Sequence, residues 1–459
     1  MRRECNRVAS YLQRHGWSLP QRAGNILNHT RIPRTPIRKP LGMDESLRQA
    51  VALLAVAIIV AIAARQFRLP YTVGLVIVGA ILTLTKPDFG LHLTHDLIFD
   101  LILPPLLFEA ALSIPWRELR RDYFPITVLA TLGTVIAACV VTAGMIWLLD
   151  WPVPSALVFG VLIAATDPVA IIAMFKDNKF KGRLCLLVES ESLLNDGAAT
   201  VLFVMALAWA QSAGHAQASL EMVTTLVRIV LGGVIIGAAF GGVAILVAKR
   251  TSEHLIEAAL TTVAAYGSFL AAEYFDVSGV LATVTAGLTI GNLDLLSTNE
   301  KGYLSLKGRE FVIALWEFAA FLANSVVFLL IGIDVAAVPF ESYGLRVLLA
   351  SVALVLLGRD LVVYPLSLLF HRSRWAISLR EQHVLWWGGL RGAQGLALAL
   401  SLPPTLPLRH EIVVVTFGVV AFSIVVQGSR CLFCCEGLGF RRGSAAWQLR
   451  DTRGNAKRL

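Results

Sequence analysis

The chain has 459 residues, of which 56% are hydrophobic and only 15% are charged. Soluble domains average about 25% charged residues, so this chain has too few polar side chains to cover its apolar surface in water. Its mean hydropathy of +0.69 agrees with that conclusion. The composition excludes a disordered chain, a coiled coil and a disulfide scaffold, and it predicts an all-α membrane protein with many spans.

The net charge of +9 is concentrated at the N-terminus, where residues 1–42 hold nine Lys or Arg and one acid. The rest of the chain is nearly neutral, which argues against nucleic-acid binding. We predict a basic tail over 1–42, a transmembrane domain over 43–435 and a short cytoplasmic tail over 436–459. Residues 1–42 lack the apolar core of a signal peptide, and they are interpreted as an extended start or a dispensable segment.

Thirteen apolar runs recur along the chain, and most are long enough to cross about 30 Å of hydrocarbon. They lie at about 47–64, 70–85, 97–114, 124–149, 154–175, 184–209, 225–248, 255–272, 277–293, 311–333, 345–370, 383–402 and 411–434.

Loop charges predict the orientation of these runs, because Lys and Arg favour the cytoplasmic side. Loops after odd-numbered runs hold seventeen Lys and Arg, whereas loops after even-numbered runs hold four. We therefore expect a cell-membrane protein whose first span begins outside and whose C-terminus is cytoplasmic. The basic tail conflicts with this orientation unless the chain starts at Met43 or the first span is placed incorrectly.

Ionisable groups inside spans cost roughly 2.5–3.5 kcal/mol each and are functional candidates by default. The third run contains Phe108-Glu109, and the fifth contains Thr166-Asp167-Pro168. Pro168 cannot donate its backbone hydrogen bond and clashes with the preceding turn, which frees carbonyls near Ala164 and Ala165. Unwound backbone at this depth lines a cavity, and its oxygens suit a small hard cation. For Asp167 we favour capping of the freed backbone over ion ligation.

The sixth run holds the densest cluster of polar residues: Glu189, Glu191, Ser192, Asn195 and Asp196. At 100° per residue these side chains cover about half of the helix surface. Such a face must look onto a cavity or a partner rather than lipid. From spacing alone Asp196 fits a helix-packing hydrogen bond as well as an ion ligand, and its polar neighbours favour the ion ligand.

Later runs carry further polar groups. Glu257 and Glu317 are interpreted as packing or funnel residues, and Arg359-Asp360 as a local polar contact. The twelfth run places Arg391 among glycines that allow close packing or unwinding. If the thirteen spans form two inverted six-helix repeats around a linker helix, the interrupted fifth and twelfth spans correspond. That is the arrangement expected of a transporter site at the repeat interface.

Four motifs together resemble the NhaP/NHE-type monovalent cation/proton antiporters of the cation:proton antiporter 1 family. They are Phe108-Glu109-Ala110, Thr166-Asp167-Pro168, Glu191-Ser192-xx-Asn195-Asp196 and Gly389-Leu390-Arg391-Gly392-Ala393. The resemblance extends from about Leu69 to Gly428. It implies a thirteen-helix fold, a homodimer and a polar funnel that opens inward.

The resemblance also implies roles for single residues. Asp196 would bind Na⁺ and a proton alternately as the carrier, with Glu109, Thr166, Ser192 and Asn195 around the ion. Glu191 and Arg391 would pair as structural support, next to Asp167 and Pro168. Asn195 stands where electrogenic relatives have a second aspartate, so we predict electroneutral exchange of one cation for one proton, in which the membrane potential does no work.

The sequence also allows other functions to be compared with cation/proton exchange. A K⁺-selective proton antiporter and a transport-inactive sensor on the same fold remain alternatives. An intramembrane protease is disfavoured because HExxH and GxSxG motifs are absent, and a channel because no repeated filter loop is visible. Cys431 and Cys434 lack a second CxxC pair, so no metal centre is expected. We expect no cofactor, and monovalent cations, protons and lipid as partners.

Overall fold

The computed structural model describes residues 41–67, 70–85, 93–169, 171–172, 175, 182–211, 219–251, 253–295, 304–337 and 345–430. The chain divides into residues 1–50 and residues 51–459. The fold described below is that of the second unit. The predicted tails over 1–42 and 436–459 lie almost wholly outside the described residues, so their boundaries stay predictions.

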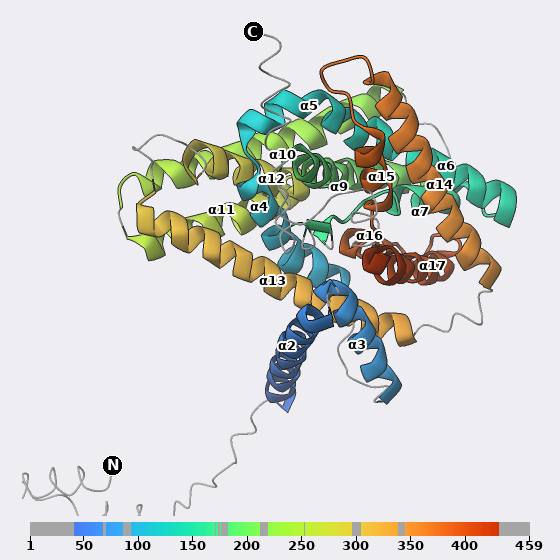
Figure 1. The fold of residues 1–459 in the computed structure, drawn as a ribbon, viewed down its shortest axis with the longest axis horizontal. Coiled ribbons are helices and arrows are strands. Elements are labelled where there is room, and N and C mark those ends of the chain that lie inside the picture. The colour runs from blue at the N-terminus through green and yellow to red at the C-terminus, as the bar shows by residue number, and fades with distance from the viewer. Residues whose placement is uncertain are drawn as a thin grey trace, which may run out of the picture. The chain divides into compact units, whose positions relative to one another are not determined.

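Most of the described residues are helical, and every predicted apolar run overlaps one or two helices (Figure 1). The α-helices are α2 Leu41–Phe67, α3 Tyr71–Thr85, α4 Leu103–Ser113, α5 Trp116–Ala130, α6 Leu132–Leu149, α7 Val153–Leu162, α9 Arg183–Gln211, α10 Ser219–Ala248, α11 His254–Tyr274, α12 Gly279–Ile290, α13 Leu306–Ala337, α14 Leu345–Leu369, α15 Leu379–Trp387, α16 Ala393–Leu400 and α17 Arg409–Phe422. Three π-helical segments, Leu97–Ile102, Gly291–Leu295 and Ser423–Gly428, adjoin α4, α12 and α17.

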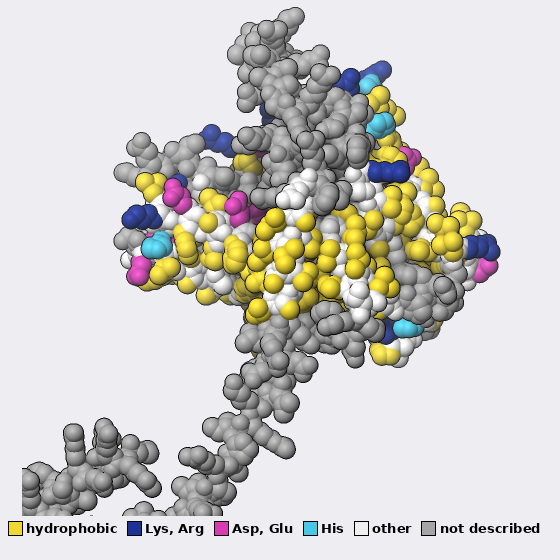
Figure 2. All heavy atoms as spheres, turned by 60° about the horizontal axis from the view of Figure 1, so that its bottom comes forward, with side chains coloured by type: hydrophobic (Ala, Val, Ile, Leu, Met, Phe, Trp, Pro, Cys, Tyr) yellow, Lys and Arg dark blue, Asp and Glu magenta, His cyan; other side chains and the backbone are white. Residues whose placement is uncertain are grey.

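Within the described residues, seven helices or joined helix pairs are long and apolar enough to cross a membrane, and four shorter apolar helices accompany them. Side chains such as Trp147, Leu84 and Leu369 are exposed although they are large and hydrophobic. Figure 2 shows hydrophobic side chains covering the middle of one face, with charged side chains toward its edges. The all-α membrane prediction is confirmed, while the count of thirteen spans and the inverted repeats stay predictions.

The predicted run 124–149 covers α6 and the second half of α5, so the first half of α5 was not predicted. Helix α5 starts at Trp116 and has non-helical dihedral angles at Asp122. The hydropathy pattern does not predict the first turns of α5, because they carry three arginines. Asp122 is buried and accepts a 2.9 Å hydrogen bond from Nε of Arg183 at the start of α9. This bond ties the kink in α5 to the first residue of α9.

Helices α3 and α13 pack at backbone contact. A Cβ atom on Gly79 would strike the backbone of Leu329, and one on Gly332 would strike the backbone of Val76. The Thr83 hydroxyl donates a 3.0 Å hydrogen bond to the carbonyl of Ile333 in the same crossing. Only glycine permits this approach, so the two helices form one close-packed pair.

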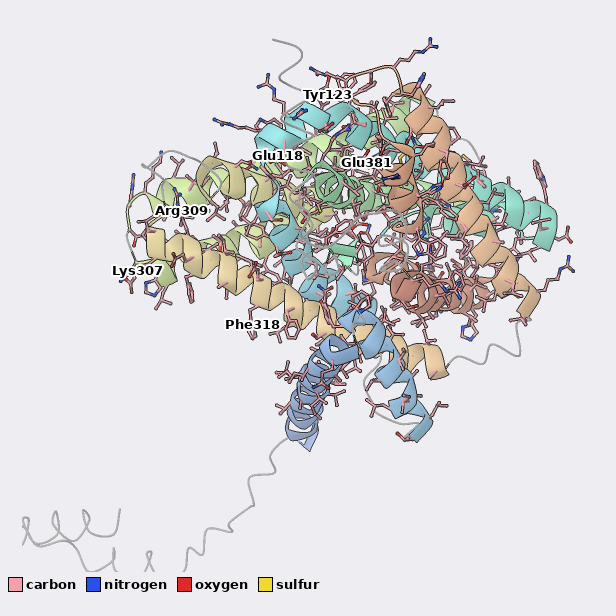
Figure 3. All side chains as sticks on the ribbon, viewed as in Figure 1. Glu118, Tyr123, Lys307, Arg309, Phe318 and Glu381 are labelled. Atoms are coloured by element: carbon pink, nitrogen blue, oxygen red, sulfur yellow. The ribbon has the colours of Figure 1, made fainter. Side chains whose placement is uncertain are left out.

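The remaining surfaces of α13 face different surroundings. Lys307 and Arg309 lie near its first turn, and Phe318 projects away from the neighbouring helices (Figure 3). Phe318 is 58% exposed, whereas Glu317 and Asn324 line a cavity. Helix α13 therefore separates an apolar outer face from a polar inner one, as expected for a helix between lipid and an internal site.

Helix α9 is seen end-on in Figure 1, with α7 and α15 to one side and α12 to the other. It contacts α5, α7, α12 and α16. Two of these neighbours are interrupted in mid-course: α7 ends at Leu162 before Pro168, and residues 388–392 separate α15 from α16. The predicted interruptions of the fifth and twelfth runs are confirmed.

Candidate functional site

A cavity of about 340 Å³ lies where the two interruptions meet α3, α4, α9 and α13. Five of the predicted site residues line it: Glu109, Thr166, Asp167, Pro168 and Asp196. Glu317, interpreted from sequence as a packing or funnel residue, lines it as well. Residues with carboxylate or hydroxyl side chains from four separate segments therefore line one cavity.

Asp196 has a carboxylate oxygen with an unmet bonding capacity. Its Oδ1 atom is buried and has no hydrogen-bond partner among the described residues. Its backbone is held firmly, because the Asp196 carbonyl accepts hydrogen bonds of 2.7 Å from Nε2 of Gln394 and 2.9 Å from the Thr200 hydroxyl. An unsatisfied buried acceptor costs about 1–3 kcal/mol, and a bound cation or proton removes that cost.

Asp167 caps the two helix fragments that begin at the interruptions. Its Oδ1 accepts a 2.9 Å hydrogen bond from the amide of Val169, and its side chain also accepts one from the amide of Ala393, the first residue of α16. The Asp167 amide in turn donates a 2.8 Å hydrogen bond to the Leu390 carbonyl. These are the hydrogen bonds that the predicted capping role of Asp167 requires, and its carboxylate offsets the positive N-terminal end of α16.

Gly392 makes this crossing possible. A Cβ atom at position 392 would overlap Oδ2, Cβ and Cγ of Asp167. Gly389 plays the same part for another residue, because a Cβ there would lie 2.5 Å from Nε of Arg359. The glycines around Arg391 therefore leave room for particular polar side chains as well as for unwinding.

Arg391 lies at the start of the break in the fifth run, next to the C-terminal end of α7, whereas Asp167 lies at its later end. It is buried, and its Nη1 faces the carbonyls of Ala164 and Ala165 at 3.5 and 3.3 Å. Its backbone amide donates a 2.8 Å hydrogen bond to the Ser423 hydroxyl. A cation at the carbonyl end of α7 offsets the negative end of that helix, so Arg391 and Asp167 stabilise opposite ends of the crossing.

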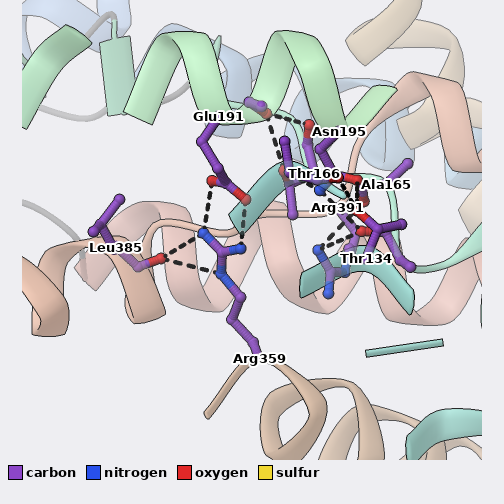
Figure 4. A network of polar contacts seen from close by, with 11 residues as sticks. Thr134, Ala165, Thr166, Glu191, Asn195, Arg359, Leu385 and Arg391 are labelled. Carbon is purple, nitrogen blue, oxygen red and sulfur yellow. Dashed lines mark hydrogen bonds and ion pairs between the residues drawn. The ribbon is translucent and has the colours of Figure 1, made fainter. Parts of the chain in front are cut away.

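Asn195 and Ser192 bind the interrupted segment instead of lining the cavity; Figure 4 shows Asn195 beside Thr166. Asn195 Nδ2 donates to the Ala164 carbonyl at 3.2 Å and to the Thr166 hydroxyl at 3.0 Å, and its Oδ1 accepts from the Thr134 hydroxyl at 2.8 Å. The Ser192 hydroxyl donates to the carbonyl of Thr166 and lies 3.0 Å from its hydroxyl. In this conformation both residues hold Thr166 in place, and neither reaches the cavity.

Glu191 pairs with Arg359, so the predicted pair of Glu191 with Arg391 is wrong. Arg359 Nη1 and Nη2 donate to the two carboxylate oxygens at 2.7 and 2.8 Å, and both groups are buried. Arg359 also donates through Nε and Nη2 to the carbonyl of Leu385 (Figure 4). The pairing differs because α14, which packs on α5 and α6, brings the Arg359 side chain to Glu191 of α9, whereas the glycine-rich break directs Arg391 toward the carbonyls that follow α7.

Sequence reasoning also missed cavity-lining residues. Tyr71, Asn324 and Gln394 line the cavity, and none was predicted. A signal for Asn324 exists, because Glu317, Phe321 and Asn324 recur at the i, i+4, i+7 spacing of one helix face. Glu257, by contrast, is a packing residue as interpreted, since its carboxylate accepts hydrogen bonds from the Ser305 amide and hydroxyl at 3.0 and 2.9 Å.

Metal-binding clusters of three or more His, Cys, Asp or Glu side chains are absent from the described part of the chain. Cys431 and Cys434 lie outside it.

Comparisons with known proteins agree with this architecture. The family model described as sodium/hydrogen exchanger, transmembrane, matches residues 51–432. The low-affinity Na⁺/H⁺ antiporter NhaS1 of Synechocystis sp. is 35% identical over 416 residues, which cover 88% of this chain and 77% of that protein. The Na⁺/H⁺ antiporter ApNhaP of Aphanothece halophytica is 38% identical over 408 residues, or 86% of this chain and 76% of that protein.

A solved structure shares the fold. The sodium proton antiporter MjNhaP1 from Methanocaldococcus jannaschii superposes with a TM-score of 0.67 at 19% identity, covering 86% of this chain and all of that one. The helices and the cavity between two broken helices define a polytopic membrane transporter. The chain belongs to the transmembrane sodium/hydrogen exchanger family.

Proposed function

We propose that this protein is a secondary antiporter that exchanges Na⁺, with Li⁺ or K⁺ as possible substitutes, for H⁺ by alternating access. The observation that carries the proposal is the unpartnered carboxylate oxygen of Asp196, a residue that lines a cavity bounded by two interrupted helices. The names of the antiporters to which the chain is similar support the same substrates. Regulation of internal pH and sodium would follow from such exchange.

Asp196 would act as the carrier because a single carboxylate can hold a cation or a proton but not both. Deprotonated, it offers a negative charge to Na⁺; protonated, it does not. Glu109 and Thr166 line the same cavity and would add oxygen ligands to the ion. Ser192 and Asn195 would contribute by fixing Thr166 where its oxygens face the cavity.

Electroneutral exchange follows if Asp196 is the carboxylate whose charge changes during the cycle. Glu191 is neutralised by Arg359, Asp167 is bonded to the amides of Val169 and Ala393, and Asn195 carries no charge. One cation would then replace one proton. The membrane potential, worth about 2.3 kcal/mol per charge per 100 mV, would not drive the reaction.

The cellular arrangement is part of the proposal. We place the protein in the cell membrane as a homodimer, with the first span starting outside and the C-terminus cytoplasmic. The loop charges support this orientation. Labelling of single cysteines introduced at Arg250 and Arg346 with an impermeant reagent tests it: the first should be protected in intact cells and the second labelled, and the reverse pattern would invert the topology.

A transport assay tests the function directly. Purified protein in vesicles with an acid interior and a quenched pH dye should release the quench when Na⁺ is added. Separate additions of Li⁺, Na⁺, K⁺ and Rb⁺ would give the cation preference, including a K⁺-selective outcome. Absence of any cation-dependent proton movement, with correctly folded protein, would leave a transport-inactive sensor as the better description.

A further inference from the structure

The residues that line the cavity carry more unsatisfied oxygens than the one on Asp196. Three of its lining residues have a buried side-chain oxygen without a hydrogen-bond partner among the described residues: Oδ1 of Asp196, Oδ1 of Asn324 and Oε1 of Gln394. They come from α9, α13 and α16. Buried polar atoms in folded proteins are nearly always paired, so three such oxygens on residues that line one cavity require a common explanation.

The Gln394 oxygen is held in a fixed orientation. Nε2 of Gln394 donates to the Asp196 carbonyl at 2.7 Å and to the Thr200 hydroxyl at 2.9 Å. Both hydrogens of the amide nitrogen are thereby engaged with α9. The opposite end of the amide is the unpartnered Oε1, and the side chain is only 6% exposed.

Asn324 belongs to a second wall of the cavity, formed by α13. Its side chain is 7% exposed, and it is a hydrogen-bond partner of Tyr71, which also lines the cavity. The ring of Tyr71 packs on Phe321, one turn before Asn324, with ring centroids 5.9 Å apart. The close contact of α3 with α13 at Gly79 and Gly332 keeps this wall rigid, so Asn324 is positioned before any ion arrives.

We propose that the amide oxygens of Asn324 and Gln394 are cation ligands that act together with Asp196, and that they set the preference among monovalent cations. Amide and carboxylate oxygens are suitable ligands for hard cations. A water occupies about 30 Å³, so the cavity has room for a cation with part of its hydration shell. Each amide would replace one of those waters. This inference rests on the proposed function.

The competing explanation is that ordinary water satisfies the two amides and the cation meets Asp196 alone. A direct binding measurement separates these cases without requiring transport. Thermal unfolding of the purified protein in detergent, titrated with LiCl, NaCl or KCl against choline chloride, reports cation binding to the folded state. The variants are N324A, N324S and Q394M, the last of which keeps the length of the side chain.

The matched control is S325A. Ser325 neighbours Asn324 on α13, is buried and also has an oxygen without a partner, but it does not line the cavity. We expect N324A and Q394M to raise the Na⁺ concentration for half-maximal stabilisation by about tenfold, the loss of about 1.4 kcal/mol per ligand. N324S, which retains an oxygen, should fall between N324A and wild type, and the Li⁺:Na⁺:K⁺ order should change.

Transport measurements complete the test. The same variants should raise the apparent KM for Na⁺ by a similar factor with a smaller effect on the maximal rate. Unchanged cation dependence in both N324A and Q394M, or a loss confined to the maximal rate, overturns the inference. If wild type binds Na⁺ without transporting it, the proposed function fails while the ligand assignment stands; if N324A does not fold, N324S and Q394M decide.

Discussion

Both terminal nitrogens of Arg359 on α14 hold the Glu191 carboxylate on α9, at 2.7 and 2.8 Å. Removal of one partner leaves the other charge buried and unpaired, which typically costs 3–5 kcal/mol. We expect R359A to lower the thermal unfolding temperature strongly. The double variant E191L/R359M should recover much of that loss, because it leaves no buried charge unpaired.

A variant on the nearby glycine-rich break provides the comparison for that experiment. Because Arg391 contacts carbonyls and no described carboxylate, E191L should not rescue R391A. Rescue of R391A by E191L, together with no rescue of R359A, would restore the pairing of Glu191 with Arg391.

Asp196 should be indispensable for exchange and dispensable for folding. D196N preserves side-chain size and removes the exchangeable charge, so cation-dependent proton movement in vesicles should disappear while the unfolding temperature stays close to wild type. D360N is the control, since Asp360 lies within α14 and does not line the cavity. Exchange retained by D196N would assign the carrier role elsewhere.

Gly392 should tolerate no side chain. G392A would push Asp167 from the amides it caps, and overpacking of this kind costs about 1–3 kcal/mol, with loss of exchange. G242A on α10 is the matched control, because a Cβ there meets nothing within 4 Å. Comparison of unfolding temperature and dye response for the two variants checks the prediction, and equal behaviour would contradict it.

Exchange should be insensitive to voltage. Potassium diffusion potentials of either sign, imposed with valinomycin across vesicles, should leave the rate of Na⁺-dependent proton movement unchanged because no net charge crosses. A rate that follows the sign of the potential would require a second exchangeable charge, and Glu109, which also lines the cavity, would be the first residue to test.

Much of this architecture could be predicted from the sequence. Pro168 and the glycines around Arg391 have strong local effects on the backbone. The two interrupted helices and their crossing could therefore be predicted from the residue types alone. Asp196 and Asp167 could be placed because several polar groups inside one span have few alternatives in a membrane.

The remaining contacts depend on how helices rotate and pack, which residue types do not specify. Arg359 and Arg391 are both arginines inside apolar runs, and only the packing of α14 on α5 and α6 decides which one reaches Glu191. Ser192 and Asn195 share a helix with Asp196, yet they point to the interrupted segment instead of the cavity. Asn324 and Gln394 escaped notice because uncharged amides are unremarkable in an apolar run.

The three hydrogen bonds of Asn195 limit how this transporter could change its stoichiometry. Two of them require an amide N–H, which points at the Ala164 carbonyl and the Thr166 hydroxyl. An ionised aspartate at this position would set its oxygen against that carbonyl, where two acceptors repel each other. A voltage-driven descendant with a second acid here would therefore need a compensating substitution elsewhere, and conversion by one codon change alone is disfavoured.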